Sequence, residues 1–104
     1  MSDRKITELQ PGRIDPLFKW QWCQALRGGE YKQHMGTLVS KGAYCCIGVG
    51  AIVAGVLDKM EFKDTNLAAK KIGLDYNTTS ELISLNDARR KTFHEIADWI
   101  EENL

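Results

Sequence analysis

The chain has 104 residues with 14 basic and 14 acidic side chains, so its formal net charge is zero. The length allows one domain with one modest hydrophobic core. Zero net charge excludes a broad electrostatic grip on nucleic acid, which needs a basic excess, and it disfavours a mimic of DNA, which needs a strongly negative surface. A hydrophobic content of 43% and a charged content of 27% are typical of a folded soluble protein.

The cysteines and the apolar centre indicate a cytoplasmic protein with no membrane span. Cys23, Cys45 and Cys46 are odd in number, two are adjacent, and no basic-then-apolar leader precedes them. A secreted disulfide scaffold would show an even, dispersed set behind a signal peptide, so we expect reduced thiols. Residues 42–57 carry no charge, but they are shorter than the about 20 residues of a spanning helix and contain four glycines.

An N-terminal arm and a first helix open the chain. Residues 1–14 lack periodicity and contain a Pro-Gly turn signal, which predicts an arm before one globular domain over residues 15–104. Asp15 followed by Pro16 is typical of a helix N-cap and first position, and the helix is predicted over 16–27.

This first helix has an apolar stripe and one tryptophan outside it. The stripe follows i, i+4, i+7, i+8 spacing and consists of Phe18, Trp22, Ala25 and Leu26. Trp20 lies about 200° round the helix from Phe18. We therefore expect the arm or a partner to cover Trp20, which favours a homo-oligomer.

A β-hairpin and a buried helix are predicted next. Residues 37–40 and 43–46 flank a Lys-Gly turn, and such a hairpin is marginal unless it packs on helices or pairs across a subunit interface. Residues 47–57 are then expected to form a buried helix. Its glycines are explained by the close approach of another helix.

Capping signals divide the second half into further helices. Asp64 is expected to cap a short helix over 67–72, which Gly73 ends in a Schellman motif. Capping boxes that begin at Thr78 and Thr92 predict helices over 79–86 and 93–103. The predicted fold is a small α+β domain of four or five helices with one short β-hairpin, in an oligomer.

Catalytic, metal and cofactor signatures are weak. Cys45 lies where a strand passes into a helix, which can activate a thiol, and His34 or His94 could act as its base. The alternative is that Cys45 and Cys46 are small buried hydrophobes. The cysteines and histidines lack zinc-site spacing, and no phosphate-binding glycine loop occurs, so we predict no catalytic residue, no metal and no cofactor.

Polar residues near the predicted hairpin and helix ends are better candidates for a binding site. Arginine forks suit phosphates and tyrosines suit stacking on a planar base. The alternative is that Asn86 and Asp87 only stop a helix while the basic residues solvate the surface. The candidate ligand-binding residues are Arg27, Tyr31, Lys32, Gln33, Tyr44, Asn86, Asp87 and Arg90.

Four motifs together resemble a family of small bacteriophage and prophage proteins. They are W-x-x-A-L-R-x-G-x-Y-x-Q over 22–33, Y-C-C-I-G-V over 44–49, L-N-D over 85–87 and F-x-E-I-A-D-x-I-E over 93–101. The chain departs from the family pattern at Gly28, where serine is usual, at Ile47, where leucine is usual, and at 50–52, where L-C-D is usual. The last departure removes a cysteine and a carboxylate and argues against catalysis or metal binding there.

The resemblance implies a phage setting, in which small proteins without enzyme signatures often act against host defence. We expect the protein to sequester a small anionic nucleotide-derived immune signal in the host cytoplasm. Arg27, Lys32 and Arg90 would hold phosphates, the tyrosines would stack, and Asn86 with Asp87 would bond ribose or base edges. A direct inhibitor of a host defence protein is the alternative, followed by a cysteine-dependent hydrolase of such a signal.

Overall fold

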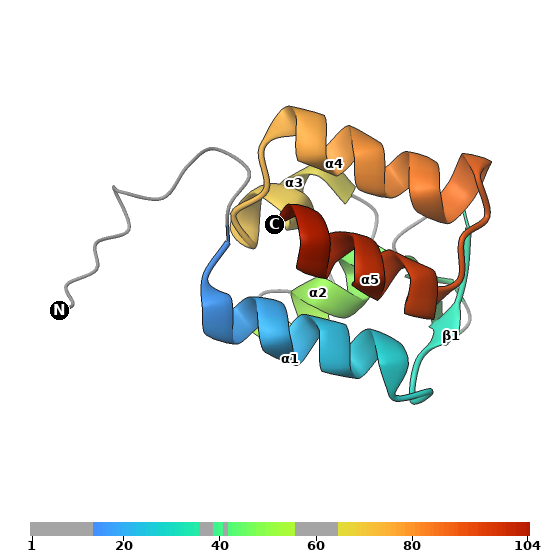
Figure 1. The fold of residues 1–104 in the computed structure, drawn as a ribbon. Helices are drawn as coiled ribbons and strands as arrows, with labels where there is room; N and C mark the ends of the chain where they lie inside the picture. The colour runs from blue at the N-terminus through green and yellow to red at the C-terminus, as the bar shows by residue number, and fades with distance from the viewer. Residues whose placement is uncertain (1–13, 36–38, 41, 56–64) are drawn as a thin grey trace, which may run out of the picture.

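In the computed structural model, which describes residues 14–35, 39–40, 42–55 and 65–104, helices surround a short central helix and a small sheet closes one end (Figure 1). The elements in chain order are α1 (Pro16–Arg27), β1 (Lys32–Gln33), β2 (Val39–Ser40), β3 (Ala43–Tyr44), α2 (Cys46–Ala54), α3 (Thr65–Lys71), α4 (Tyr76–Ile83), the π-helix η3 (Ser84–Ala88) and α5 (Phe93–Asn103). The predicted α+β class is confirmed, with five α-helices among the described residues.

Helix α2 is the centre of the core. All residues from Cys46 to Ala51 are buried, and α1, α3 and α4 each pack against this helix. A Cβ on Gly50 would lie 2.8 Å from Cε2 of Trp22, so the glycine allows the indole of α1 to approach the helix backbone. The expected close approach of a neighbouring helix therefore holds at this position.

Helices α1 and α5 lie side by side over α2 (Figure 1), and both match their predicted bounds. The Asp15 carboxylate accepts a hydrogen bond from Phe18 N at 3.0 Å, which caps α1. At the start of α5, Thr92 and Glu95 form the predicted capping box. Local end signals thus define both helices, whose apolar faces then meet in the core.

The hairpin is confirmed, but it belongs to a larger sheet. Strands β2 and β3 are antiparallel with Ser40 opposite Ala43, and Gly42 in the turn has a φ of 82°. Strand β1 pairs in parallel with the other edge of β3, giving the order β1-β3-β2. The sequence predicted a polar connection at β1, because two residues carry no periodic signal. Residues 37, 38 and 41 of the predicted hairpin lie outside the described part.

The predicted boundaries of the buried helix were wrong at both ends. Cys45 is the N-cap of α2, so Cys46 belongs to the helix and not to the hairpin. At the other end Gly55 adopts a φ of 74° and stops α2 after Ala54, because glycine enters the left-handed region at little steric cost. Residues 56–64, including the expected cap Asp64, lie outside the described ranges.

The Schellman stop of α3 is confirmed. Gly73 has a φ of 92° and its N–H donates to Lys70 O at 3.1 Å, while Leu74 N donates to Ala69 O at 3.0 Å. This motif turns the chain back and buries Leu74 against the core.

The predicted start of α4 was three residues late. Asp75 is the N-cap, and its carboxylate Oδ1 accepts from Thr78 N at 2.7 Å. Thr78 therefore lies inside the first turn, since its amide is already taken by the earlier carboxylate. After Ile83 the helix continues as the π-helix η3, in which Arg89 N donates to Ser84 O at 2.8 Å.

The core extends to Ile14, which precedes α1 and is 5% exposed although the sequence assigned it to the arm. The outer face of α1 stays open: Leu17 is 62% and Trp20 is 59% exposed. Residues 1–13 lie outside the described ranges. None of the helices described is both long and apolar enough to cross a membrane.

Candidate functional site

Most of the predicted ligand-binding residues meet where the sheet, the first turn of α2 and the π-helix η3 come together. The register places Lys32 opposite Ala43 and Gln33 opposite Tyr44. The group at this junction consists of Tyr31, Lys32, Gln33, Tyr44, Asn86 and Asp87.

Asn86 is the centre of this junction and is fully buried. Its Oδ1 accepts from Gln33 Nε2 at 3.0 Å and from Cys46 N at 3.2 Å. Its Nδ2 donates to His34 O and to Asp87 Oδ1, both at 2.8 Å. The amide therefore uses two acceptor and two donor positions and ties β1, α2 and η3 together.

Gln33 extends the same network out of the sheet. Its Nε2 also donates to Lys91 O at 2.7 Å, just before α5. Both amide hydrogens of Gln33 are thereby directed at protein acceptors. Gln33 and Asn86 thus form a frame for the site and are not open to bind a ligand through these atoms.

Tyr31 and Tyr44 pack on each other at the edge of this frame. Their ring centroids lie 5.4 Å apart at an interplanar angle of 88°, an edge-to-face pair, and both are half-buried. The backbone tie between His34 N and Tyr44 O, at 2.7 Å, holds the two chain segments together.

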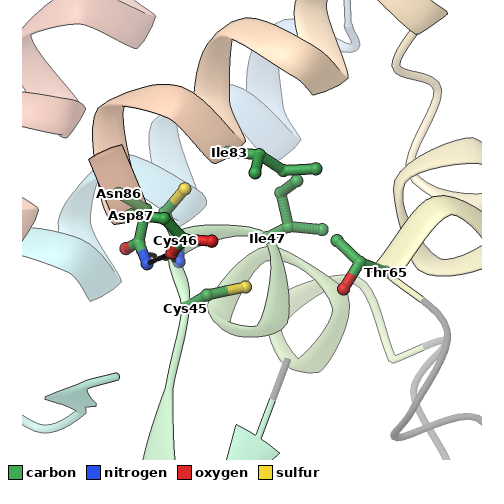
Figure 2. A pocket seen from close by; sticks show the side chains of 7 residues that line it. All are labelled: Cys45, Cys46, Ile47, Thr65, Ile83, Asn86 and Asp87. Atoms are coloured by element: carbon green, nitrogen blue, oxygen red, sulfur yellow. Dashed lines mark hydrogen bonds between the residues drawn. The ribbon is translucent and has the colours of Figure 1, made fainter. Parts of the chain in front are cut away.

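A pocket of about 320 Å³, part of it open to solvent, lies beside Asn86. In Figure 2 its walls come from the start of α2, from the end of α4 with η3, and from Thr65 at the start of α3. Its lining residues are Cys45, Cys46, Ile47, Thr65, Ile83, Asn86 and Asp87. Only about 70 Å³ of this space is accessible to the centre of a water molecule, well below the roughly 300–1,000 Å³ of small-molecule pockets, so the hollow takes one part of a ligand and not a whole nucleotide.

The thiols at the pocket are held as protonated groups. Cys45 Sγ accepts from Gly48 N at 3.4 Å, yet burial raises the pKa of the Cys45 thiol. Burial also raises the pKa of Cys46 well above its ordinary value, and its Sγ donates to Leu82 O at 3.7 Å. An activated nucleophile needs a lowered pKa, so the structure favours the alternative in which these cysteines are buried hydrophobes.

The predicted cations lie outside the pocket. Neither Lys32 on the edge strand β1 nor Arg90 after η3 lines it, and both are exposed. Arg90 has a φ of 55°, a left-handed conformation that is uncommon for residues other than glycine. This conformation lets Lys91 N reach Leu85 O at 2.8 Å and ends the π-helix.

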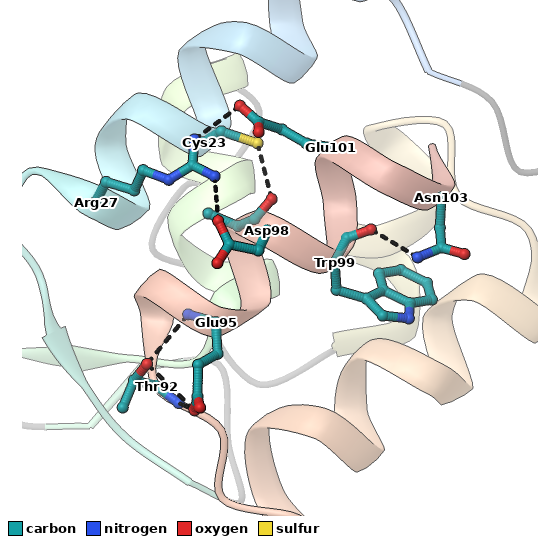
Figure 3. A network of polar contacts seen from close by, with 9 residues as sticks. Cys23, Arg27, Thr92, Glu95, Asp98, Trp99, Glu101 and Asn103 are labelled. Atoms are coloured by element: carbon teal, nitrogen blue, oxygen red, sulfur yellow. Dashed lines mark hydrogen bonds and ion pairs between the residues drawn. The ribbon is translucent and has the colours of Figure 1, made fainter.

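Arg27 belongs to a different part of the molecule. Figure 3 shows its guanidinium between Asp98 and Glu101 of α5, with N–O distances of 2.6 and 2.8 Å. The hydrogen bonds that Arg27 donates to Glu101 and to Asp98 raise the pKa of Arg27, and the bond to Glu101 lowers the pKa of that carboxyl group. Its role in the structure is to join α1 to α5, and both carboxylates would compete with any phosphate.

Sequence reasoning missed Thr65, Ile47 and Ile83 as pocket residues. Their types carry no ligand signal, and only the packing of α2 against α3 and α4 brings them together. Cys45 was singled out at the correct boundary, between strand and helix, but as a possible nucleophile. Among the described residues no group of three His, Cys, Asp or Glu side chains could hold a metal ion.

Comparison with known proteins identifies one family to which the chain is similar. No curated protein and no solved structure shows significant similarity to the chain. A family model described as "Domain of unknown function (DUF8296)" matches residues 14–66, which is half of the chain and covers α1, the sheet, α2 and the first residues of α3. The chain therefore belongs to the DUF8296 family.

Proposed function

We propose that the protein is a phage anti-defence protein that binds and sequesters a small nucleotide-derived immune signal in the host cytoplasm. The observation that carries this proposal is the pocket beside Asn86, whose walls stand on a satisfied hydrogen-bond frame. Rigidly held walls lower the ordering cost of binding, which suits tight retention of a ligand.

The lining suggests which part of a nucleotide would enter. Ile47 and Ile83 provide apolar walls, while the Asp87 carboxylate and the Thr65 hydroxyl offer polar contacts. A carboxylate accepts N–H and O–H groups and repels phosphate, so the pocket suits a base or a ribose. The phosphates would stay outside the pocket, and Lys32 and Arg90 are the exposed cations proposed to hold them.

Retention without turnover is supported by the state of the cysteines. Burial raises the pKa of all three thiols, and for Cys23 the value is about 11. A hydrolase that used Cys45 would need a thiolate near neutral pH. Sequestration therefore agrees better with this site than the hydrolase does.

The exposed face of α1 favours a protein partner as well. Leu17 and Trp20 are large apolar side chains that stand open on one helix. We propose that a second copy of the chain covers them, so that the binding protein is a homo-oligomer. Direct inhibition of a host defence protein through this same face is the second candidate function.

Ligand recovery tests the proposal. The protein is incubated with lysate from defence-activated cells, repurified and heated, and the released small molecules are identified by mass spectrometry. We expect an unaltered nucleotide-derived compound. Thr65→Phe, which fills the pocket, should abolish its recovery, whereas Ser80→Phe on the exposed side of α4 should not.

Other outcomes separate the alternatives. Recovery of nothing from folded wild-type protein would contradict sequestration, and an altered compound would favour the hydrolase. Light scattering of wild type and Trp20→Glu tests the oligomer, with Gln24→Glu on the same helix as the control. A monomeric wild type that co-purifies with one host protein, and loses it on Trp20→Glu, would favour the direct inhibitor.

A further inference from the structure

We propose that a second pocket, between α3 and the start of α4, binds a nucleoside monophosphate: a planar base joined through a sugar to one anionic group. The pocket holds about 570 Å³, part of it open solvent. Its lining residues are Asn66, Lys70, Leu74, Asp75, Tyr76 and Thr79. None of them lines the pocket beside Asn86, so this inference stands or falls independently of the proposed function.

Three polar side chains at this pocket have no partner among the residues that the structure describes. Within the described part of the chain, Asn66, Lys70 and Tyr76 make no side-chain hydrogen bond and no ion pair. Tyr76 is 79% exposed, the most open large apolar or aromatic side chain described. An amide, an ammonium and an aromatic ring are therefore available around one hollow.

Hydrogen bonds within the protein hold the floor of the pocket in place. The Schellman motif buries Leu74, and Asp75 Oδ1 caps α4 by accepting from Thr78 N at 2.7 Å. The Thr79 hydroxyl donates to Asp75 O at 2.7 Å. The three available side chains thus surround a preformed floor, as expected of a ligand site.

Each group matches one part of a nucleoside monophosphate. The ring of Tyr76 offers a face on which a base can stack. The ammonium of Lys70 suits a phosphate, and it is the cation that the pocket beside Asn86 lacks. Asp75 has acceptor capacity beyond its cap bond, and carboxylates commonly accept ribose hydroxyls.

The charges of the pocket restrict the ligand further. Lys70 is positive and Asp75 is negative, so the lining has no net charge to attract a bare anion. We therefore expect adenosine monophosphate to bind more tightly than either inorganic phosphate or adenosine alone. This requirement for both parts distinguishes a nucleotide site from a surface lysine.

Amide NMR titrations of the full chain with adenosine monophosphate, adenosine and inorganic phosphate test this. Adenosine monophosphate should shift resonances of residues 66–79, and Lys70→Ala should weaken its binding about tenfold. Lys71→Ala, one residue further along α3, removes the same charge outside the pocket and should change binding less than about twofold. Tyr76→Phe should retain binding, whereas Tyr76→Ala should lose it.

Three results would overturn the inference. These are no shift at millimolar nucleotide, equal effects of Lys70→Ala and Lys71→Ala, or shifts confined to residues 45–47 and 83–87. The last result would instead support the site of the proposed function. Conversely, the titration could shift resonances of residues 66–79 while the lysate experiment recovers no compound. That combination would support the nucleoside monophosphate site and contradict the proposed sequestration of an immune signal.

Discussion

The Asn86 junction and the Arg27 clamp hold the same domain together by opposite means. Asn86 is fully buried, uncharged and bonded at each of its amide positions. Arg27 is charged and joins α1 to α5 near the surface, where its partners Asp98 and Glu101 are 62% and 52% exposed. Both residues were expected to bind ligand, and both are used within the protein.

Polar contacts contribute differently to stability in these two regions. A buried group that loses its partner cannot turn to water, so breaking the Asn86 network leaves several unsatisfied atoms. An exposed ion pair that is broken is replaced by hydration. The junction should therefore dominate the free energy of unfolding, although the clamp has the shorter distances.

Asn86→Ala should give the largest effect. It leaves Cys46 N and His34 O without their side-chain partner and opens a cavity, so we expect a loss of about 2–4 kcal/mol in the free energy of unfolding. Urea titration measures it. Asn103→Ala, which removes an exposed amide bonded to Trp99 O, is the matched control and should cost under about 0.5 kcal/mol. Equal losses in the free energy of unfolding for Asn86→Ala and Asn103→Ala would contradict the idea that burial makes the Asn86 network important.

Trp22→Phe tests a second buried tie to the same residue of α2. Trp22 Nε1 donates to Cys46 O at 3.0 Å, whereas the N–H of the same residue donates to Asn86 Oδ1. We expect a loss of about 1–3 kcal/mol from the missing bond and the smaller ring. Phe18→Leu at the half-buried neighbouring ring controls for aromatic packing. If Trp22→Phe left the free energy of unfolding unchanged, the hydrogen bond to Cys46 O would not contribute to stability, and only the bonds of Asn86 would.

Arg27→Ala should cost less, about 0.2–1 kcal/mol, because its partners are exposed. The cost should shrink at high salt, which screens exposed charges. Arg89→Ala, which breaks the exposed pair with Glu81 at 3.0 Å, offers a comparison within α4 and η3. If Arg27→Ala lowered the free energy of unfolding as much as Asn86→Ala does, and did so equally at low and high salt, the exposed clamp would be as important as the buried junction.

Acid should weaken the clamp. The bond from Arg27 lowers the pKa of Glu101 below 4.5 in the folded chain. Because the folded pKa is the lower one, this contribution is complete above the unfolded value and is lost as pH falls through the folded value. Thermal midpoints at about pH 7 and about pH 3 should therefore differ less in Arg27→Ala than in wild type. An unchanged difference would show that other carboxylates dominate.

Much of the fold follows from local chemistry that the sequence displays. Asp15 with Pro16 and the Thr92–Glu95 box define α1 and α5, because a cap satisfies helix amides within a few residues of itself. The turn glycine Gly42 likewise predicts the hairpin. Asp75 and Thr78 are both residues that can cap a helix. The Asp75 carboxylate accepts from Thr78 N, so α4 begins earlier than a cap at Thr78 predicts.

Local sequence signals therefore predict the α+β class, the bounds of α1 and α5, the hairpin and the stop of α3. The roles of the polar residues, by contrast, depend on contacts between distant segments. The tertiary structure paired Arg27 with α5, turned Asn86 inward to join β1 and α2, and added β1 to the sheet. The physical reason is range: caps and turns act over three or four residues, whereas Arg27 and Asn86 find partners 71 and 40 residues away.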